Sequence, residues 1–438
     1  MRFFFTLLFT KFVDWVVRTF RLGAGSTWPG EIALRMDAFF IRTTLSKSSI
    51  QVIIVVGTNG KTTTSSMIVY GLRKAGKTVI HNPEGANLAN GVASCLIRNA
   101  KLNGSLPQDF AVFEVDENAF SSIVRDIPHP YAILFLNIFR DQLDRYGEVH
   151  SIVSRWEESL ATLSPKTHLL LNGDDPSLVY LGTKKSEQAI YFGAQKSDKT
   201  KKLLGHDVDS IHCPVCGKKL SYSAISYSHL GTFSCTCGFT SPEISEEELK
   251  PLEGFAGVYN RYNMKAALIA LEVCLQKKGS ELRPLLDGFK PAFGRQERIR
   301  AMDNDWILLL SKNPAGFNQS IQALPELLHH EKTPVVLVLN DRIPDGRDVS
   351  WIWDVEFEDL IQHASLLITS GDRTYDMAIR MKYCFEEENN NSVHPTPDLE
   401  DALKKAAAHK NKNVSIVILA TYTGMLEARK LLVGKKLL

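Results

Sequence analysis

One stretch of sequence decides the fold of this chain: Gln51-Val-Ile-Ile-Val-Val-Gly-Thr-Asn-Gly-Lys-Thr-Thr63. It opens with a continuous apolar run, Gln51–Val56, rich in β-branched residues and typical of a buried parallel strand. The run ends at Gly57, and helical character continues from Thr62 to Ala75, where Gly76 stops it. A strand, a glycine-containing loop and a helix in this order predict a phosphate-binding loop, because loop amides and a helix N-terminus attract phosphate oxygens.

The residue types within the loop predict how ATP and Mg²⁺ would be held. Lys61 would reach the β- and γ-phosphates, and the hydroxyl of Thr62 would bind Mg²⁺. The spacing is shorter than in the common form of the motif, since Val55 stands where its first glycine would be. The alternative is a strand–turn–helix unit with glycine and lysine there by chance, which the combination of strand, loop, Lys-Thr pair and helix disfavours. The expected nucleotide-binding loop consists of Gly57, Thr58, Asn59, Gly60, Lys61, Thr62 and Thr63.

The rest of the chain repeats the alternation of strands and helices, which predicts an α/β fold with mostly parallel sheets. We expect an N-terminal helical segment over 1–50, a central ATP-binding domain over 51–300 and a C-terminal Rossmann-like α/β domain over 301–438. A loop is expected from Gly23 to Gly30, and a helix from Tyr262 to Lys278. The expected strands of the central domain are 111–115, 132–136 and 168–171, and those of the C-terminal domain are 306–310, 335–339, 366–369 and 414–419.

Three acidic residues follow the apolar stretch at 111–115. Glu114, Asp116 and Glu117 would stand at the carboxyl end of a parallel strand, where ligands bind in open α/β sheets. Hard cations take carboxylate oxygens, so one of these residues is expected to bind Mg²⁺. We choose Glu114, although the residue types alone do not separate the three and a solvated acidic loop is the alternative.

Four of the seven cysteines form a cluster, in the order Cys213-Pro-Val-Cys216 and Cys235-Thr-Cys237. A glycine follows each pair, as in tight knuckle turns, and four thiolates at this spacing suit tetrahedral Zn²⁺. We expect a structural zinc ribbon inserted at about 205–245, since no open coordination position is evident. The alternatives are a redox pair and a nucleic-acid-binding ribbon.

Composition limits the partners of the chain. Lys and Arg number 51 against 49 acidic residues, which argues against nucleic acid as a partner. The three other cysteines are scattered in apolar segments, so a reducing cytoplasm is expected rather than a disulfide framework. Residues 1–20 are rich in Phe and Trp but interrupted by charges, and their apolar run is too short to span a bilayer. A helix packed on its own domain and an interfacial helix remain open.

An ordered set of short motifs surrounds the loop and resembles the MurT family, the Mur-ligase-like synthetase subunits of lipid II isoglutaminyl synthases. The match extends over nearly the whole chain. The motifs that carry it are Gly25–Thr27 with Pro29-Gly30, Gly57–Thr62, Asn82-Pro83, Gly85–Asn87, Asn137–Arg145, Leu171–Pro176, the cysteine cluster, Tyr259–Asn263, Phe293–Glu297, Lys312–Gly316, Asp345–Trp351 and Ala420–Thr423.

The resemblance implies amidation of the α-carboxyl of D-glutamate in lipid II, by way of an acyl phosphate, in peptidoglycan synthesis. Ammonia would come from a GatD-like glutaminase subunit in a heterodimer that works at the inner face of the cell membrane. By the same resemblance Asp348 would complete the partner's catalytic triad, and Glu114 would bind Mg²⁺. Asn260 and Asn263 would lie near the adenine, and Arg295 would approach the phosphates.

Two departures from the wider Mur ligase superfamily stand out. Gln142 occupies the position of a metal-binding His in many relatives, which puts a second Mg²⁺ in doubt. Leu309 replaces an Asp that binds ribose. Two other functions remain open: a stand-alone amino-acid ligase of the folylpolyglutamate type, and a zinc-bearing, nucleotide-dependent binding protein without ligase activity.

Overall fold

The computed structural model describes residues 1–20, 27–82, 85–127, 129–139, 149–193, 210–244, 252, 255–290, 295–329, 331–385, 392–409 and 414–434. Gln142 lies outside these ranges, as do both ends of the expected zinc ribbon and most of the loop expected from Gly23 to Gly30. The end of that expected loop is wrong, because helix α2 begins at Trp28, with Pro29 at one of its first positions, where proline is favoured.

The first unit is built on a six-stranded sheet whose paired strands all run parallel. Its central strand alternates between two cores, because successive side chains of a strand point to opposite faces: Ile54 faces one core and Ile53 the other. The expected strands of this unit are confirmed. In spatial order the strands are β2 (Val79–His81), β3 (Phe110–Val115), β1 (Gln51–Val56), β4 (Ala132–Phe135), β5 (His168–Asn172) and β6 (Ala189–Phe192).

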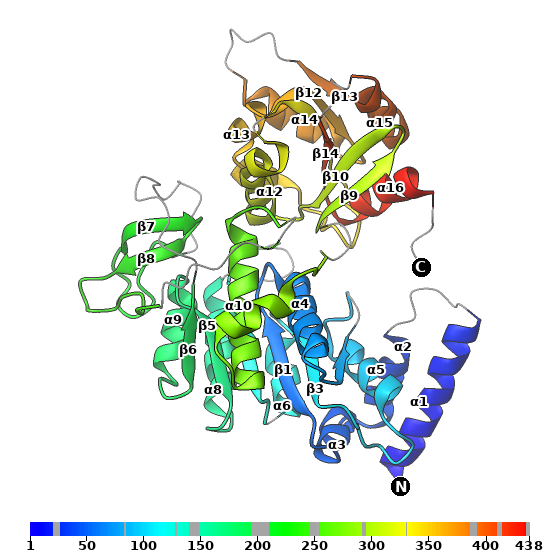
Figure 1. The fold of residues 1–438 in the computed structure, drawn as a ribbon, viewed down its shortest axis with the longest axis vertical. Helices are drawn as coiled ribbons and strands as arrows, with labels where there is room; N and C mark the ends of the chain where they lie inside the picture. Colours follow the sequence, from blue (N-terminus) through cyan, green and yellow to red (C-terminus); the bar gives the residue numbers. More distant parts are fainter. Residues whose placement is uncertain are drawn as a thin grey trace.

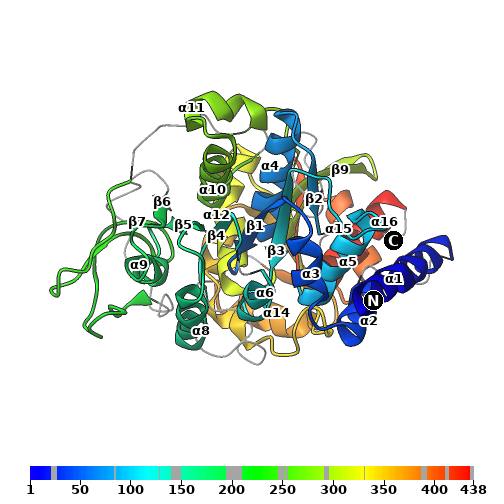
Figure 2. The ribbon, with the colours of Figure 1, turned by 90° about the horizontal axis from the view of Figure 1, so that it is seen from below.

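Helices cover both faces of this sheet, which gives the doubly wound arrangement seen in Figures 1 and 2. Side chains of α4 and α10 share a core with Ile53 on one face. α10 begins a turn earlier than expected, at Val258, and ends at Leu275. The helices are α1 (Arg2–Thr19), α2 (Trp28–Met36), α3 (Phe40–Ser46), α4 (Lys61–Lys74), α5 (Ala89–Asn99), α6 (Phe120–Asp126), α8 (Val149–Ala161), α9 (Pro176–Thr183), α10 (Val258–Leu275), α11 (Gly279–Leu282) and the 3-10 turn η2 (Arg283–Leu286).

The second unit contains another six-stranded sheet. All its paired strands run parallel except β9, which pairs antiparallel with β10. Its strands in spatial order are β13 (Val393–Pro395), β12 (Ala364–Ser370), β11 (Thr333–Val338), β14 (Ile416–Ala420), β10 (Asn304–Leu310) and β9 (Arg295–Ala301). Its helical segments are α12 (Pro314–Leu328), η3 (Ser350–Asp354), α13 (Phe357–Ile361), α14 (Thr374–Lys382), α15 (Leu399–Ala408) and α16 (Tyr422–Val433). The sheet begins at Arg295, a few residues before the boundary expected near 300.

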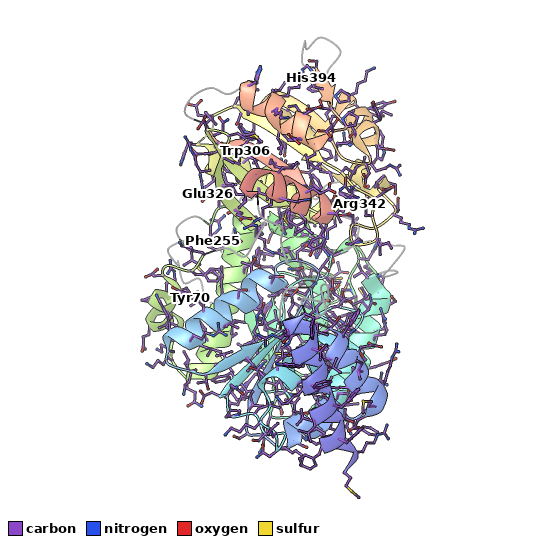
Figure 3. The ribbon with its side chains drawn as sticks, turned by 90° about the vertical axis from the view of Figure 1, so that its right-hand side faces the viewer. Tyr70, Phe255, Trp306, Glu326, Arg342 and His394 are labelled. Carbon is purple, nitrogen blue, oxygen red and sulfur yellow. The ribbon has the colours of Figure 1, made fainter. Side chains whose placement is uncertain are left out.

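The two units meet along the edge at which α10 and α12 lie, and Figure 3 shows Phe255 and Glu326 at this level, with Tyr70 in the first unit and Trp306 in the second. The amide of Gly257 donates to a carboxylate oxygen of Glu326 at 2.9 Å, which fastens the start of α10 to α12. The hydrogen bond between Gly257 and Glu326 thus joins the two units at the start of α10.

The inserted hairpin formed by β7 (Ser221–Tyr227) and β8 (Leu230–Ser234) stands beside α9. Phe233 of β8 and Cys213 share an apolar cluster with Val179 of α9. At the other end of the hairpin, the hydroxyl of Tyr227 donates to the carbonyl of Ala315 in α12. The hairpin therefore contacts both α/β units.

Helix α1 lies at the edge of the first unit and packs on α2 and α5 (Figures 1 and 2). Leu7 is fully buried, and Phe3 stacks on Phe40 with ring centroids 5.5 Å apart. The helix expected over residues 1–20 is therefore packed on its own domain through one face. Among the described helices none is both long and apolar enough to cross a membrane.

Candidate active site

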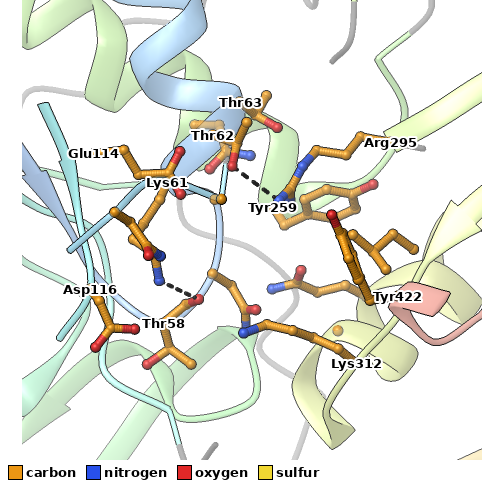
Figure 4. Close-up of a pocket in the computed structure, with 18 of the residues that line it drawn as sticks. Thr58, Lys61, Thr62, Thr63, Glu114, Asp116, Tyr259, Arg295, Lys312 and Tyr422 are labelled. Atoms are coloured by element: carbon orange, nitrogen blue, oxygen red, sulfur yellow. Dashed lines mark hydrogen bonds between the residues drawn. The ribbon is translucent and has the colours of Figure 1, made fainter. Parts of the chain in front are cut away.

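A cavity of about 910 Å³ lies between the two units, at the carboxyl ends of strands from both sheets. The carboxyl edge of a parallel sheet is where α/β proteins bind ligands, since loops rather than helices cover it. In Figure 4 Glu114, Lys61 and Thr58 lie on one side of the cavity, and Tyr422 and Lys312 on the other. Lining residues from the first unit include Thr58–Thr63, Glu114, Asp116, Asn260 and Asn263, and those from the second include Arg295, Leu309, Lys312, Gly316 and Tyr422.

The phosphate-binding loop has a backbone that only glycine tolerates at its helix start. Gly60 precedes α4 with φ of 87°, and a Cβ there would lie 2.2 Å from the Oδ1 atom of Asn263. Asn263 in turn accepts a bond from the Thr64 hydroxyl at 3.3 Å. Asn263 is thus packed against the loop itself, and Asn260 lies beside it, with Asn263 Nδ2 donating to Asn260 Oδ1 at 3.3 Å.

A second segment of the chain, following β4, holds the loop from the other side. The amide of Thr58 donates to the Asn137 carbonyl at 3.1 Å, and the amide of Asn59 donates to Asn137 Oδ1 at 2.9 Å. The Thr58 hydroxyl accepts a bond from the Phe139 amide at 3.0 Å. These bonds fix the loop shape, so its remaining amides can be directed at a ligand without further ordering cost. Of the expected loop residues, Gly57 alone does not line the cavity.

Lys61 is buried and surrounded by oxygen atoms. Its ammonium donates to the carbonyls of Gly57 and Thr58 and lies 2.9 Å from a carboxylate oxygen of Glu117. Three donors meet three acceptors, so the hydrogen-bonding capacity of the ammonium is satisfied.

The three acids after β3 take different positions. Glu117 pairs with Lys61, and its backbone carbonyl accepts a bond from the Trp156 indole at 3.0 Å. Glu114 and Asp116 both line the cavity. Glu114 is also held through its backbone, since Asn82 Oδ1 accepts from its amide and Asn82 Nδ2 donates to its carbonyl, each at 2.9 Å. Residue types left the three acids equivalent, whereas the fold gives each a separate environment.

Arg295, on β9 of the second unit, reaches the loop of the first. Its guanidinium donates to the Thr62 hydroxyl at 3.3 Å, and its Nε is buried with no hydrogen-bond partner in the described part of the chain. The neighbouring Gln296 fixes the strand start by bonding to Ala256 at both amide and carbonyl and to the Tyr259 hydroxyl. Burial raises the pKa of Tyr259 to about 12, so this phenol stays protonated and can donate.

Several residues that line the cavity were not among the site residues expected from the sequence, including Leu88, Lys312 and Tyr422. Lys312 lies at the carboxyl end of β10, next to Asn313, whose side chain caps α12 by accepting from the Gly316 amide at 2.7 Å. The signal was present, because a lysine between a buried strand and a helix cap stands at the ligand edge of a sheet. Leu309, expected to be unable to bind ribose, is buried at the cavity wall.

Asp348 lies outside this cavity, on an exposed loop of the second unit. Its Oδ1 accepts from the Ser350 amide at 2.8 Å, and this bond holds the pKa of the carboxyl below its ordinary value. Its sequence neighbour Asp345 is buried instead, with both carboxylate oxygens bonded to Thr423. Asp345 therefore holds the loop to α16 and is not available at the surface as Asp348 is.

The four clustered cysteines converge as a candidate metal centre. Their sulfur atoms all lie within 4.8 Å of one another, with Cys213 and Cys237 3.7 Å apart and Cys216 and Cys235 3.5 Å apart. Tetrahedral zinc with Zn–S bonds of about 2.3 Å requires sulfur atoms about 3.8 Å apart, so the donor set fits zinc.

The comparisons with known proteins agree with this geometry. The family model "Mur ligase middle domain" matches residues 55–271, and "MurT ligase C-terminal" matches residues 310–425. The chain is 32% identical over 92% of both chains to "Lipid II isoglutaminyl synthase (glutamine-hydrolyzing) subunit MurT" of Staphylococcus aureus (strain COL). The Streptococcus pneumoniae (strain ATCC BAA-255 / R6) protein of the same name is also 32% identical, over 95% of this chain and 94% of its own.

Among solved structures, a pseudomurein peptide ligase type C from Methanothermus fervidus is similar with a TM-score of 0.65 and 24% identity, covering 87% of this chain and 78% of its own. Its likeness shows the fold. The relatives and the family model assign the chain to the Mur-type ligases, and the two sheets agree with that fold. Within that class the chain belongs to the MurT family, which confirms the family and the enzyme class expected from the sequence.

Proposed function

We propose that this chain is the ATP-using subunit of a lipid II isoglutaminyl synthase. It would amidate the α-carboxyl of D-glutamate in the lipid II stem peptide to D-isoglutamine, at the inner face of the cell membrane. The observation that carries the proposal is the cavity in which the loop of the first unit faces Arg295 and Lys312 of the second. Family membership supports the substrate and the reaction.

The reaction would proceed in two steps. A carboxylate oxygen attacks the γ-phosphorus of ATP and ADP leaves; ammonia then attacks the acyl carbon and phosphate leaves. Lys61 and Arg295 would neutralise charge on the phosphoryl group in the first step, since such transfers depend mainly on positioning and electrostatics. The Arg295–Thr62 contact supports closure of the second unit over the loop, which would keep water from the acyl phosphate.

The lining of the cavity fits a Mg²⁺ ion. The hydroxyl of Thr62 and the carboxylate of Glu114 are hard oxygen donors on the same wall, and Mg²⁺ prefers such donors. Bound there, the ion would screen the negative charge of the phosphates. ATP would contact the loop residues Thr58–Thr63, and its adenosine would extend toward Asn260 and Asn263.

A glutaminase subunit would dock on the second unit beside Asp348. Exposed apolar side chains lie on η3, which follows Asp348 in the chain, and on α14, which contacts η3. They are Trp353 on η3, Tyr375 and Ile379 on α14, and Tyr383 directly after α14. Trp353 and Tyr383 contact each other edge to face at 5.5 Å. An exposed aromatic patch is typical of protein interfaces, and the MurT relatives are named as subunits. Asp348 would then orient an imidazole of the partner's catalytic triad.

Mass spectrometry of lipid II tests the proposal. Lipid II is incubated with ATP, Mg²⁺ and glutamine, with this chain alone and together with its glutaminase partner. A carboxyl-to-amide mass change that requires both proteins supports the proposal. Unmodified lipid II with both proteins, combined with ATP consumption by this chain when an amino acid is added, points instead to a stand-alone amino-acid ligase. Nucleotide binding without any product would point to a binding protein.

A further inference from the structure

Helix α1 turns an apolar face outward as well as inward. Phe4, Phe5, Leu8, Phe9, Phe12 and Trp15 are each 42–67% exposed. They recur at helical spacing, and their rings contact one another: Phe5 stacks on Phe9 at 6.3 Å and Phe12 on Trp15 at 5.9 Å. We call these six residues the aromatic face of α1. Isolated surface aromatics are common, but a continuous run of them indicates a binding surface.

The orientation of this face is fixed by the opposite side of the helix. Asp14 lies on the buried side of α1 and pairs with Arg98 of α5 at 2.8 Å. The Lys11 ammonium donates to the Ile97 carbonyl at 2.7 Å. Phe3 packs between Phe40 and the loop at Gly104. Both sides of the helix are therefore accounted for: one is held by the domain, and the other projects from the edge of the molecule in Figures 1 and 2.

The exposed charged side chains of α1 are basic. Asp14 is the only acidic residue of α1, and it is buried, pairing with Arg98 at 2.8 Å and more distantly with Arg18 at 4.0 Å. The exposed charged residues of the helix are Arg2 and Arg18, and the ammonium of Lys47 sits over the Phe4 ring at 5.1 Å. Basic groups flanking Phe and Trp match the chemistry of an anionic phospholipid surface, where aromatic rings sit at headgroup level.

We propose that the aromatic face of α1 is a bilayer-docking surface that lies in the interface of an anionic membrane. A projecting, convex helix suits a deformable lipid surface, and α1 is not a membrane-spanning helix. This inference rests on the proposed function, because docking at a membrane would serve an enzyme whose substrate, lipid II, is held in the membrane. Binding of α1 to the bilayer does not itself require lipid II.

The path from this surface to the cavity is short. Ile97 and Arg98, near the carboxyl end of α5, contact α1. At the other end of α5, the helix begins directly after Leu88, which lines the cavity. The helix has 11 residues, which at 1.5 Å per residue corresponds to about 16 Å. Docking of α1 would therefore hold the cavity within a short reach of the membrane surface.

Vesicle cosedimentation tests the inference with the full chain, without ATP or lipid II. Vesicles of phosphatidylcholine with phosphatidylglycerol are compared with phosphatidylcholine alone. The variant Phe5→Gln/Phe12→Gln/Trp15→Gln should lower the partition coefficient at least a hundredfold, since each buried ring contributes on the order of tenfold. Arg18→Glu should weaken binding on the order of tenfold on the anionic vesicles, and added salt should weaken it further.

Tyr375→Gln/Tyr383→Gln is the matched control, because it removes two equally exposed rings from the second unit. It should leave vesicle binding unchanged, while the α1 variant should leave ATP-induced thermal stabilisation unchanged. Tryptophan emission should shift to the blue on binding, and this shift should be reduced in Trp15→Phe. Absence of vesicle binding by the unaltered chain, or equal binding by the α1 variant, overturns the inference.

A third result would also overturn it: a solution dimer that the α1 variant dissociates, which would assign the face to a second copy of the chain. Failure of the proposed function would look different. Amidation of lipid II in detergent micelles with the partner present would then be absent in the unaltered chain, whereas vesicle binding would persist. Retained micellar amidation by the α1 variant, with lost vesicle binding, is the expected combination.

Discussion

The Nζ atom of Lys61 lies 2.9 Å from the Oε2 atom of Glu117, and both side chains are almost completely buried. The lysine expected to bind phosphates is thus paired with a carboxylate of its own chain. A phosphate bound to Lys61 would compete with Glu117 as its counter-charge, so we predict that nucleotide binding and this ion pair are coupled.

Glu117→Gln should lower the stability of the protein in the absence of ATP and increase the stabilisation that ATP provides. Removing one partner of a buried pair leaves an uncompensated charge and costs on the order of 3 kcal/mol in the free energy of unfolding. ATP supplies the missing negative charge, so its stabilising effect should grow. Thermal unfolding with and without ATP and Mg²⁺ measures both. Glu400→Gln, which breaks an exposed pair with Lys404, is the control and should change little. An ATP-induced shift equal to that of the unaltered chain would contradict the coupling.

The double variant Lys61→Met/Glu117→Gln separates folding from catalysis. It replaces the buried ion pair by neutral groups, so we expect its stability to return close to that of the unaltered chain. Amidation should nevertheless fall on the order of a hundredfold or more, because the charge that stabilises the transferring phosphoryl group is missing. The measurements are thermal unfolding and ATP-dependent amide formation. Turnover retained in a stable double variant would exclude Lys61 from the reaction.

Arg295→Ala should lower kcat more than it weakens ATP binding. The guanidinium reaches Thr62 from the other unit, so it would act on phosphate charge mainly when the units close. We expect a fall in kcat on the order of a hundredfold. Arg298→Ala, an exposed arginine on the same strand, is the matched control. Comparable losses in both variants would indicate general damage to β9.

Asp348→Asn should abolish glutamine-dependent amidation while ammonium-dependent amidation persists. The residue lies outside the ATP cavity, so a role in the partner's triad predicts loss only of the step that releases ammonia. The pKa of Asp348 is lowered by the Ser350 amide, so its charge should persist below neutral pH. The assay compares glutamine with ammonium chloride as nitrogen source. Asp354→Asn is the control, and loss of both activities in Asp348→Asn would assign it to folding or ATP chemistry.

Zinc removal should affect more than the ribbon. Cys216→Ser is expected to lose the metal and lower the melting temperature, as measured by metal analysis and thermal unfolding. Tyr227→Phe should keep zinc but reduce amidation a few-fold, because it loses the bond to Ala315 beside the cavity residue Gly316. Cys274→Ser is the control for zinc content, since burial raises the pKa of this thiol to about 12. Unchanged amidation in Tyr227→Phe would limit the zinc to local folding.

Local patterns predicted much of the fold. The strand at 51–56 and the helix after it were expected within a residue or so, because a buried apolar run and a glycine-bounded helix are read from neighbours in sequence. The start of α2 was missed, since Pro29 reads equally well as a loop residue and as a first-turn helical residue. The antiparallel strand β9 was missed for another reason: its alternating polar pattern, Arg295–Ala301, contains few apolar residues.

By itself, the sequence indicated the phosphate-binding loop and the two cysteine pairs, because the loop and each pair consist of residues only a few positions apart. The β7–β8 hairpin then brings the two pairs together. Tertiary structure decided which acid pairs with Lys61, and it brought Arg295 to Thr62 across the cleft. It also decided that α1 keeps an aromatic face uncovered. Charge pairing and burial depend on distances between segments far apart in the chain, and no local pattern of residues specifies those distances.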